Sequence, residues 1–551
     1  MNGPTLFDLS SVFSAVAAAV PDQDMLVWRD RRVTYSEVDR RIDAIAAYLR
    51  TTDLGCHTER KDLARHESGQ DHLGIYLRNG TEYLEAMIAG YRARVAPFNV
   101  SYRYVEDELT FLLADSNARA LAYHAEFAPR IAAIRADLPH LRVLIQVADD
   151  SGHELLPGAV DYETVIAATQ PTASQPGPSG EDLYILYTGG TTGMPKGVLW
   201  RQHDIFLAAM GGRPFGSAGP LASYAELADR VRQAAGAVSL LMLPPFIHGA
   251  AQWGAFHAIT MGGRIVIPDD VRRLDAHEVL RLAERERVLS IPVVGDAMAR
   301  PLVEALEHRQ YDLTSLAAIS NGGAPLSPPM RQRIMVALPH VSIIDGVGAS
   351  ESGMQLNAST NNDCQPETAT FPPQPDTAVL SAERDRILAP GEGDGWLARR
   401  DLIPLGYLGD PDKTEQTFPT VNGTRWSVPG DRARILPDGR IELLGRDSLT
   451  INSGGEKIYV EEVERAIAAH PAVSDVIVVG RPSPRWGSEA IAIIALAAET
   501  SVADHELINT CRGHIADYKI PKAFIRAPMI IRSPAGKADY RWAAALAAAQ
   551  A

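Results

Sequence analysis

The residues best suited to chemistry lie in one glycine-rich stretch, YTGGTTGMPKG (residues 187–197). Its four glycines leave backbone N–H groups open, its three threonines add hydroxyl donors, and Lys196 adds a cation. Such groups together suit a polyphosphate. A Walker A loop would place Gly directly before the Lys, whereas Pro195 stands there in this sequence. The stretch therefore predicts a phosphate loop outside the P-loop NTPase class.

Short apolar runs that end at or near Gly, Pro or Asp predict strands followed by loops. Such runs cover 184–188, 238–243, 263–268, 317–320 and 341–345. Ligands of α/β proteins bind at the loops that follow strands. Glu351 comes after the last run and a glycine turn, so we expect its carboxylate to face the same pocket as the glycine-rich stretch.

The elements that must position these groups alternate between helix and strand patterns. Residues 34–50 begin with Thr and repeat apolar residues at three- and four-residue spacing, which is typical of a capped amphipathic helix. Further on, the pattern predicts strands at 72–77, 119–123 and 142–147 and helices at 82–93 and 108–116. Residues 432–445 predict a hairpin whose turn is Pro437-Asp438-Gly439. This alternation favours an α/β fold.

Residues from about 446 onward predict a separate small unit. Helices are expected at 460–470 and 505–518, and strands at 475–480 and 490–497. Between residues 169 and 180 the composition shifts to Pro, Ser, Gly and Thr, which predicts a loop.

The composition is that of a globular protein of two to four domains, with 551 residues, 46% hydrophobic and 22% charged. The 53 basic against 68 acidic side chains give a net charge of −15, which disfavours nucleic acid as a partner. The scattered Cys56, Cys364 and Cys511 predict neither a disulfide framework nor a zinc site. The N-terminus lacks a positive signal-peptide region, and no apolar window is long enough for a membrane span. We therefore expect a cytoplasmic protein.

Four segments resemble, in order, the motifs of the acyl-adenylating superfamily of acyl-CoA synthetases, luciferases and peptide adenylation domains. They are YTGGTTGMPKG (187–197), GVGASESG (346–353), SVPGDRARILPDGRIELLGR (427–446) and SPAGKADYRW (533–542). The resemblance covers nearly the whole chain. It implies a large multi-subdomain α/β domain over 1–445 and a small mobile α+β domain over 446–551. The implied hinge lies near 446–448, and we favour Asp447-Ser448.

The resemblance implies that ATP activates a carboxylate in two steps. Attack on the α-phosphate releases pyrophosphate, and the thiol of coenzyme A then captures the acyl-adenylate. Lys537 would bridge the carboxylate and the α-phosphate, and Glu351 would bind Mg²⁺. Asp431 would accept hydrogen bonds from the ribose hydroxyls, and Arg446 would contact the nucleotide. Because one site performs both steps, the small domain would rotate between them.

The implied binding residues extend over both domains. The phosphates would be held by Thr188, Gly189, Gly190, Thr191, Thr192, Gly193 and Lys196, of which Thr192 and Lys196 are also catalytic candidates. The adenine would lie along Asn321, Gly322, Gly323, Asp345, Gly346, Val347 and Ser350. Val347 departs from the family, since many members have a stacking aromatic there. Gly454 and Gly455 would border the pantetheine channel, unless they form a plain β-turn.

The segment 240–256 matches the family's acyl pocket and is apolar. The candidate wall residues are Phe246, His248, Trp253, Gly323, Gly353 and Met354, although His248 could instead belong to the core. No Asp stands there for a substrate ammonium, so we expect a hydrophobic acid rather than an amino acid. Segments 200–206 and 344–353 look similar to actinobacterial acyl-CoA ligases. They favour a medium-chain, long-chain or sterol side-chain carboxylate.

Two alternatives to an acyl-CoA ligase stay open at this point. An acyl-adenylate ligase could load a carrier-protein thiol instead of coenzyme A, and a sensor could bind nucleotide without catalysis. The five key side chains Lys196, Glu351, Asp431, Arg446 and Lys537 are all present, which disfavours the sensor. A homo-oligomer is a possible assembly.

Overall fold

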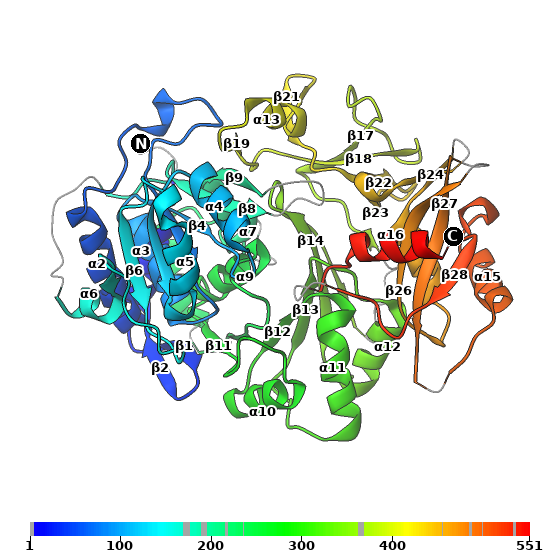
Figure 1. Cartoon of the computed structure of the whole chain (residues 1–551), viewed down its shortest axis with the longest axis horizontal. Helices are drawn as coiled ribbons and strands as arrows, with labels where there is room; N and C mark the ends of the chain where they lie inside the picture. The colour runs from blue at the N-terminus through cyan, green and yellow to red at the C-terminus, as the bar shows by residue number, and fades with distance from the viewer. Residues whose placement is uncertain are drawn as a thin grey trace.

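The computed structural model describes residues 5–168, 177–188, 195–214, 217, 219–234, 236–361, 369–453, 456–483, 487–498, 500–532 and 536–550. Within these residues the strands form four sheets. Figure 1 shows the N-terminal part and the orange and red C-terminal part at opposite ends of the molecule, with green strands between them.

The first sheet has eight strands and is mostly parallel. Its order is β15 (Gly353–Thr360), β14 (Ser342–Ala349), β13 (Ala318–Gly322), β12 (Ser290–Val293), β10 (Ser239–Leu241), β11 (Arg264–Ile267), β1 (Asp24–Trp28) and β2 (Arg31–Thr34). The second eight-stranded sheet runs β19 (Gly406–Tyr407), β9 (Lys196–Arg201), β8 (Leu183–Thr188), β4 (Ala96–Asn99), β3 (His72–Tyr76), β5 (Ala118–His124), β6 (Val143–Val147) and β7 (Val160–Asp161). The strands predicted at 72–77, 119–123 and 142–147 are confirmed as β3, β5 and β6.

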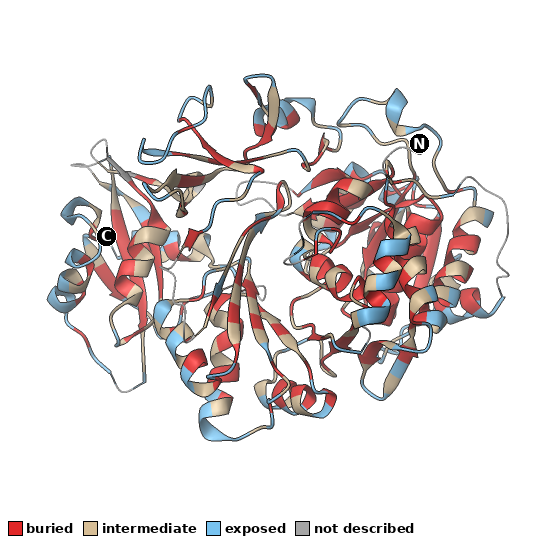
Figure 2. Cartoon of the chain, turned by 180° about the vertical axis from the view of Figure 1, so that it is seen from behind, coloured by how far each residue is buried: buried red, intermediate tan, exposed pale blue. Residues whose placement is uncertain are grey.

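Helices fill the space between these two sheets and cover their outer faces. One apolar core joins both sheets through α1 (Leu9–Ala19), α2 (Tyr35–Thr51), α3 (Thr81–Arg92), α7 (Gln202–Ala209) and α9 (Gly249–Ile259). The outer faces carry α4 (Glu106–Asp115) and α5 (Ala128–Ile134) on the second sheet and α10 (Ala276–Glu286), α11 (Gly295–His308) and α12 (Pro328–Ala337) on the first. Figure 2 shows the buried residues concentrated on strands and inner helix faces. At the start of α2, the Thr34 side chain accepts a hydrogen bond from the Glu37 N–H, as the capped pattern predicts.

The third sheet is antiparallel. It contains β16 (Thr370–Phe371), β23 (Ile441–Arg446), β22 (Asp431–Ile435), β18 (Asp394–Arg400), β21 (Thr424–Ser427) and β20 (Thr420–Val421), with β17 (Thr377–Leu380) beside β18. The hairpin predicted over 432–445 is confirmed as β22 and β23. The remaining large-domain helices are α6 (Tyr162–Ala168), α8 (Tyr224–Ala234) and α13 (Pro411–Thr417).

The small C-terminal unit is built on the fourth sheet. Its strands are β25 (Glu456–Ile458), β24 (Ile451–Ser453), β27 (Gly487–Leu496), β26 (Val473–Ser483) and β28 (Ala523–Arg526). Helices α14 (Val460–Ala468) and α15 (Asp504–Arg512) pack on one face and α16 (Tyr540–Ala549) on the other. The helix predicted over 505–518 is too long, because α15 ends at Arg512 before Gly513, which favours a helix C-terminus. The chain leaves the third sheet after Arg446 and enters the fourth at Ile451.

Candidate active site

The predicted phosphate loop connects two neighbouring antiparallel strands. Thr188 at the end of β8 lies opposite Lys196 at the start of β9. Both ends of the loop are therefore held by the second sheet. Five of the predicted phosphate ligands lie outside the described residues: Gly189, Gly190, Thr191, Thr192 and Gly193.

Lys196 has a carboxylate partner that the sequence motifs do not indicate. Its ammonium forms a salt bridge with Asp410 Oδ2, and its Nζ lies 6.0 Å from the centre of the Tyr407 ring. Asp410 stands at the N-cap of α13, where its Oδ1 accepts a hydrogen bond of 2.9 Å from the Lys413 N–H. Burial opposes ionisation of Asp410, yet the bond to Lys196 prevails and lowers its pKa.

Glu351 occupies the turn between β14 and β15, and its carboxylate is held by a phenol. The Tyr407 hydroxyl donates a hydrogen bond of 2.8 Å to Glu351 Oε1. The backbone of the same turn is tied down by Ser427, which donates to the Glu351 carbonyl, and by Trp200, whose Nε1 donates to the Ser350 carbonyl at 2.8 Å. Sequence reasoning missed Tyr407 and Ser427, because only the tertiary fold brings them to Glu351.

Asp431 and Arg446 form an ion pair across the hairpin of β22 and β23. They are direct cross-strand partners, and Arg446 Nε lies 2.9 Å from Asp431 Oδ1. The negative charge of Asp431 outweighs burial, and together with Glu351 it raises the pKa of Arg446. The Arg446 N–H also donates to Glu461 Oε1 of the small domain at 3.2 Å.

Lys537 reaches the large domain from the C-terminal unit. Gly536, directly before it, has a φ of +76°, and a Cβ there would lie 2.6 Å from the Val294 carbonyl oxygen. The red C-terminal trace accordingly reaches the green strands in Figure 1. Burial away from water lowers the pKa of Lys537, and the positive charge of Arg446 lowers it further. The negative charge of Glu351 opposes this shift. Lys537, Arg446 and Glu351 are therefore close enough to sense one another's charge.

The two predicted adenine segments are strand rather than turn: Asn321 and Gly322 end β13, and residues 345–347 lie within the neighbouring parallel strand β14. Asn321 Nδ2 donates to Asp345 Oδ1 at 2.9 Å, and Arg331 donates to Asp345 Oδ2 at 2.6 Å. Asn321 and Asp345 are buried, and their hydrogen bond joins the two strands where Gly322 lies opposite Gly346. Val347 packs at the edge of the core that contains Leu356, Phe371, Val379, Leu388, Leu397, Ala433 and Ile441.

Some of the predicted acyl-pocket residues lie beside the catalytic candidates. His248 takes the N-cap position of α9, and its buried Nε2 has no hydrogen-bond partner among the described residues. Burial, followed by the charges of Lys537 and Arg103, lowers the pKa of His248 to about 4, so the imidazole is neutral near pH 7. Met354 Sδ lies 3.0 Å from where a Cβ would stand on Gly346.

Three of the other predicted acyl-pocket residues, Phe246, Trp253 and Gly353, are tightly packed. Phe246 is fully buried with its ring 5.3 Å from that of Tyr83, and Trp253 is buried on α9. Gly353 has a φ of +63°, and a Cβ there would lie 3.2 Å from the Ala208 Cβ. Gly323, with a φ of +79°, is the more open glycine, since a Cβ there would meet only Val294 at 3.6 Å. Gly454 and Gly455 lie outside the described residues.

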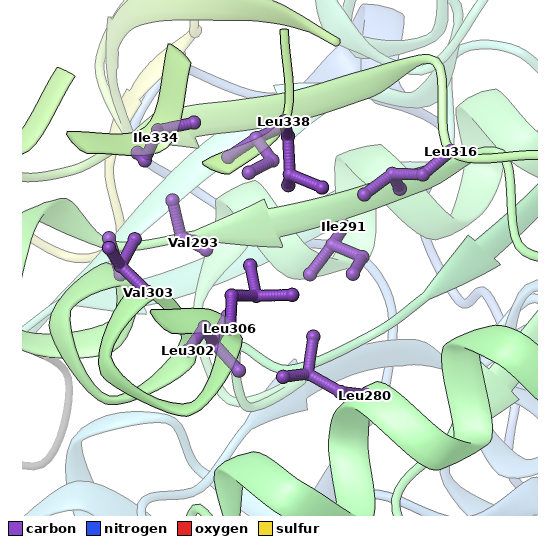
Figure 3. A pocket seen from close by; sticks show the side chains of 11 residues that line it. Leu280, Ile291, Val293, Leu302, Val303, Leu306, Leu316, Ile334 and Leu338 are labelled. Atoms are coloured by element: carbon purple, nitrogen blue, oxygen red, sulfur yellow. The ribbon is translucent and has the colours of Figure 1, made fainter. Parts of the chain in front are cut away.

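The apolar cavity of Figure 3 is separate from these residues. It has a volume of about 10 Å³ and is lined by Leu280, Ile291, Val293, Ala299, Leu302, Val303, Leu306, Leu316, Ile319, Ile334 and Leu338. A space of this size holds no more than about one water. It is a packing gap between the first sheet and its outer helices, not a ligand pocket.

Comparison with known families identifies the chain. The model of the AMP-binding enzyme family matches residues 13–407, which is more than half of the sequence. The chain belongs to the AMP-binding enzyme family. A second model, that of the AMP-binding enzyme C-terminal domain, matches residues 462–537. The predicted superfamily is therefore confirmed.

Two curated relatives of this family member share nearly its whole length. It is 55% identical to the medium-chain acyl-CoA ligase Mig of Mycobacterium avium, over 98% of each chain. It is 38% identical to the 3-oxocholest-4-en-26-oate–CoA ligase of Rhodococcus rhodochrous, over 95% of this chain and 93% of the relative. The prediction of an ATP-dependent acyl-CoA ligase that works through an acyl-adenylate is confirmed.

Solved structures confirm the predicted fold of this family member. The anthranilate CoA ligase AuaEII in complex with anthranoyl-AMP superposes with a TM-score of 0.80 at 21% identity, over 98% of each chain. The ATP-bound MatB of Rhodopseudomonas palustris also gives 0.80, at 19% identity over 98% of this chain and 99% of that one. Among the residues that the structure describes, there is no helix with the length and apolarity of a membrane span.

Proposed function

We propose that this acyl-CoA ligase activates a medium-chain fatty acid with Lys537, Arg446 and Glu351 as its central charged groups. The observation that carries the proposal is their convergence: a lysine from the C-terminal unit lies within electrostatic reach of the arginine of β23 and the glutamate after β14. Such an arrangement can hold a carboxylate and a triphosphate close together, although both are anions.

The described residues fit a magnesium-bound nucleotide. Glu351 Oε1 accepts the Tyr407 hydrogen bond, while its Oε2 accepts none from the described residues. A carboxylate oxygen of this kind is the hard ligand that Mg²⁺ prefers. Mg²⁺ held there would neutralise phosphate charge. Asp431 remains the candidate for the ribose hydroxyls, because only part of its carboxylate is used by Arg446.

In the first half-reaction, Lys537 brings the fatty-acid carboxylate to the α-phosphate, and the carboxylate oxygen displaces pyrophosphate. The positive charges of Arg446 and Lys196 stabilise the charge that develops on the phosphates. In the second half-reaction, the thiolate of coenzyme A attacks the acyl carbonyl and AMP leaves. The small domain turns about residues 446–448 between the two steps.

The medium-chain preference is drawn from the relative at 55% identity and from the chemistry of the predicted wall. Met354 offers apolar surface, and the neutral His248 adds no charge that would attract a polar acid. A sterol side-chain acid is the second candidate, because the relative at 38% identity is named for such an acid.

A Lys537→Ala variant tests the residue assignment through the separate half-reactions. It should lose at least about 100-fold in adenylate formation, measured as acid-dependent ATP–pyrophosphate exchange. It should still convert supplied acyl-adenylate and coenzyme A to the thioester. Lys522→Ala changes an exposed lysine of the same domain and is the matched control. Equal losses in both half-reactions would refute the assignment of Lys537 to the first step.

A panel of medium-chain, long-chain, aromatic and sterol side-chain acids tests the substrate. AMP release with coenzyme A should be fastest for the medium-chain acids. Exchange without thioester formation on coenzyme A, together with loading of a carrier protein, would overturn the choice of coenzyme A as acceptor.

A further inference from the structure

Asp410, the salt-bridge partner of Lys196, is held in place by the backbone around it. Asp410 is anchored at the first turn of α13, where Oδ1 caps the helix through the Lys413 N–H and Oδ2 faces Lys196. Its backbone is bridged to Tyr407, the residue that holds Glu351. The carboxylate is thus fixed next to the end of the loop that we assign to the phosphates.

Few other charges compete for Lys196 in this part of the structure. Tyr407 presents its ring, 6.0 Å from Nζ. Asp115 adds a more distant negative charge, but its carboxylate accepts a hydrogen bond of 2.7 Å from the Tyr187 hydroxyl. Among the described residues, Asp410 makes the one salt bridge to Lys196, and both side chains remain partly exposed, at 47% for Lys196 and 31% for Asp410. A polyphosphate can therefore reach the ammonium from the solvent side.

We propose that Lys196 alternates between two partners, the phosphates of ATP and the carboxylate of Asp410. Asp410 re-forms its salt bridge with the Lys196 ammonium when the β- and γ-phosphates leave as pyrophosphate. The inference rests on the proposed function, because it requires Lys196 to bind the phosphates of ATP. The fixed carboxylate competes with those phosphates, so it weakens the binding of ATP and pyrophosphate alike. In return it lowers the barrier to the release of pyrophosphate. Asp410 is a positioning residue that acts through Lys196 and does not touch the reacting atoms.

The variant Asp410→Asn separates this charge effect from the helix cap. Asparagine caps helices as well as aspartate, so the bond to the Lys413 N–H is kept while the negative charge is lost. Because exposed ion pairs are weak, we expect pyrophosphate and ATP to bind about threefold more tightly. The inhibition constant of pyrophosphate and the KM for ATP should both fall. Asp412→Asn, an exposed change in the same first turn of α13, should leave both constants unchanged.

A double-mutant cycle with Lys196→Gln distinguishes the proposal from a structural role of Asp410. In the Lys196→Gln background, Asp410→Asn should no longer tighten pyrophosphate binding, because there is then no ammonium for which Asp410 and pyrophosphate compete. The same threefold effect in both backgrounds, or no difference between Asp410→Asn and Asp412→Asn, would overturn the proposal. Failure of the unaltered protein to bind ATP, measured by calorimetry with a non-hydrolysable analogue, would instead count against the proposed function.

Discussion

The carboxyl group of Glu464 makes the stability of the small domain depend on pH. Glu464 lies on α14, where it accepts a hydrogen bond of 2.8 Å from the Val478 N–H and contacts the Tyr540 hydroxyl. Burial, followed by the negative charge of Glu461, raises its pKa from 4.5 to about 8. The folded domain therefore keeps this proton at pH values where the unfolded chain has lost it. The contribution of Glu464 to its stability must therefore fall as the pH rises from about 4.5 to 8.

The size of the effect follows from the distance between the two pKa values. At pH 7 the unfolded carboxyl is ionised, whereas the folded one keeps its proton. Ionisation at pH 7, above a pKa of 4.5, stabilises the unfolded chain by about 3 kcal/mol relative to the folded one. This figure is an upper limit, since Glu464 is only partly buried as a residue and retains some contact with water. A Glu464→Gln variant is uncharged in both states, and its amide oxygen can still accept the Val478 N–H. It should therefore be more stable than the unaltered protein at pH 7, by an amount that shrinks towards zero near pH 5.

Thermal unfolding between pH 5 and 8 measures this difference, and amide exchange in β26 assigns it to the small domain. Glu506→Gln is the control, because Glu506 is exposed on α15 and glutamine preserves its capping contact with the Ala503 N–H. The difference in Tm between Glu464→Gln and the unaltered protein should widen with pH, and that of the control should stay constant. Parallel curves for all three proteins would refute the reasoning.

Three further perturbations test the site. Tyr407→Phe removes the 2.8 Å donor to Glu351 while keeping the ring, so kcat/KM for magnesium-ATP should fall about tenfold, with Tm nearly unchanged. Gly445→Ala should lower Tm, because φ is +129° and the new Cβ would lie 2.0 Å from Glu461 Oε2; adding Glu461→Ala should restore part of the loss. His248→Gln should become more stable relative to the unaltered protein as the pH falls from 6.5 towards 4, since the folded state resists protonation of His248; equal acid sensitivity of both proteins would contradict this.

The part of the site that depends on residues close together in the sequence could be predicted. The hairpin of β22 and β23 follows from alternating apolar residues around a Pro-Asp-Gly turn, and its register makes Asp431 and Arg446 partners. The strand predicted over 341–345 extends through Gly346 and Gly348 to Ala349, so the turn that carries Glu351 begins later than the glycine pattern predicts. In the hairpin, neighbours in the sequence determine the conformation.

The parts that the sequence did not predict depend on contacts between distant segments. Tyr407 meets Glu351 across 56 positions, and Asp410 meets Lys196 across 214. No periodicity or turn signal marks these pairs, because β19 and α13 are far along the chain from β9 and from the turn after β14, and only the tertiary fold brings them together. The predicted length of α15 is wrong for a different reason. The apolar spacing of the helix continues past Arg512, but Gly513 ends the helix.

The charge balance of the candidate site explains how a protein with a net charge of −15 can bind ATP, a carboxylic acid and coenzyme A. Each candidate cation already has a carboxylate beside it: Lys196 has Asp410, Arg446 has Asp431, and Lys537 is attracted by Glu351. The carboxylates therefore reduce the mutual repulsion of these cations and their non-specific attraction for anions. Under the proposed function, binding is an exchange in which phosphate oxygens replace the protein carboxylates beside these cations or share the cations with them. Because only the difference between the two sets of contacts remains, the anionic products can leave after each step.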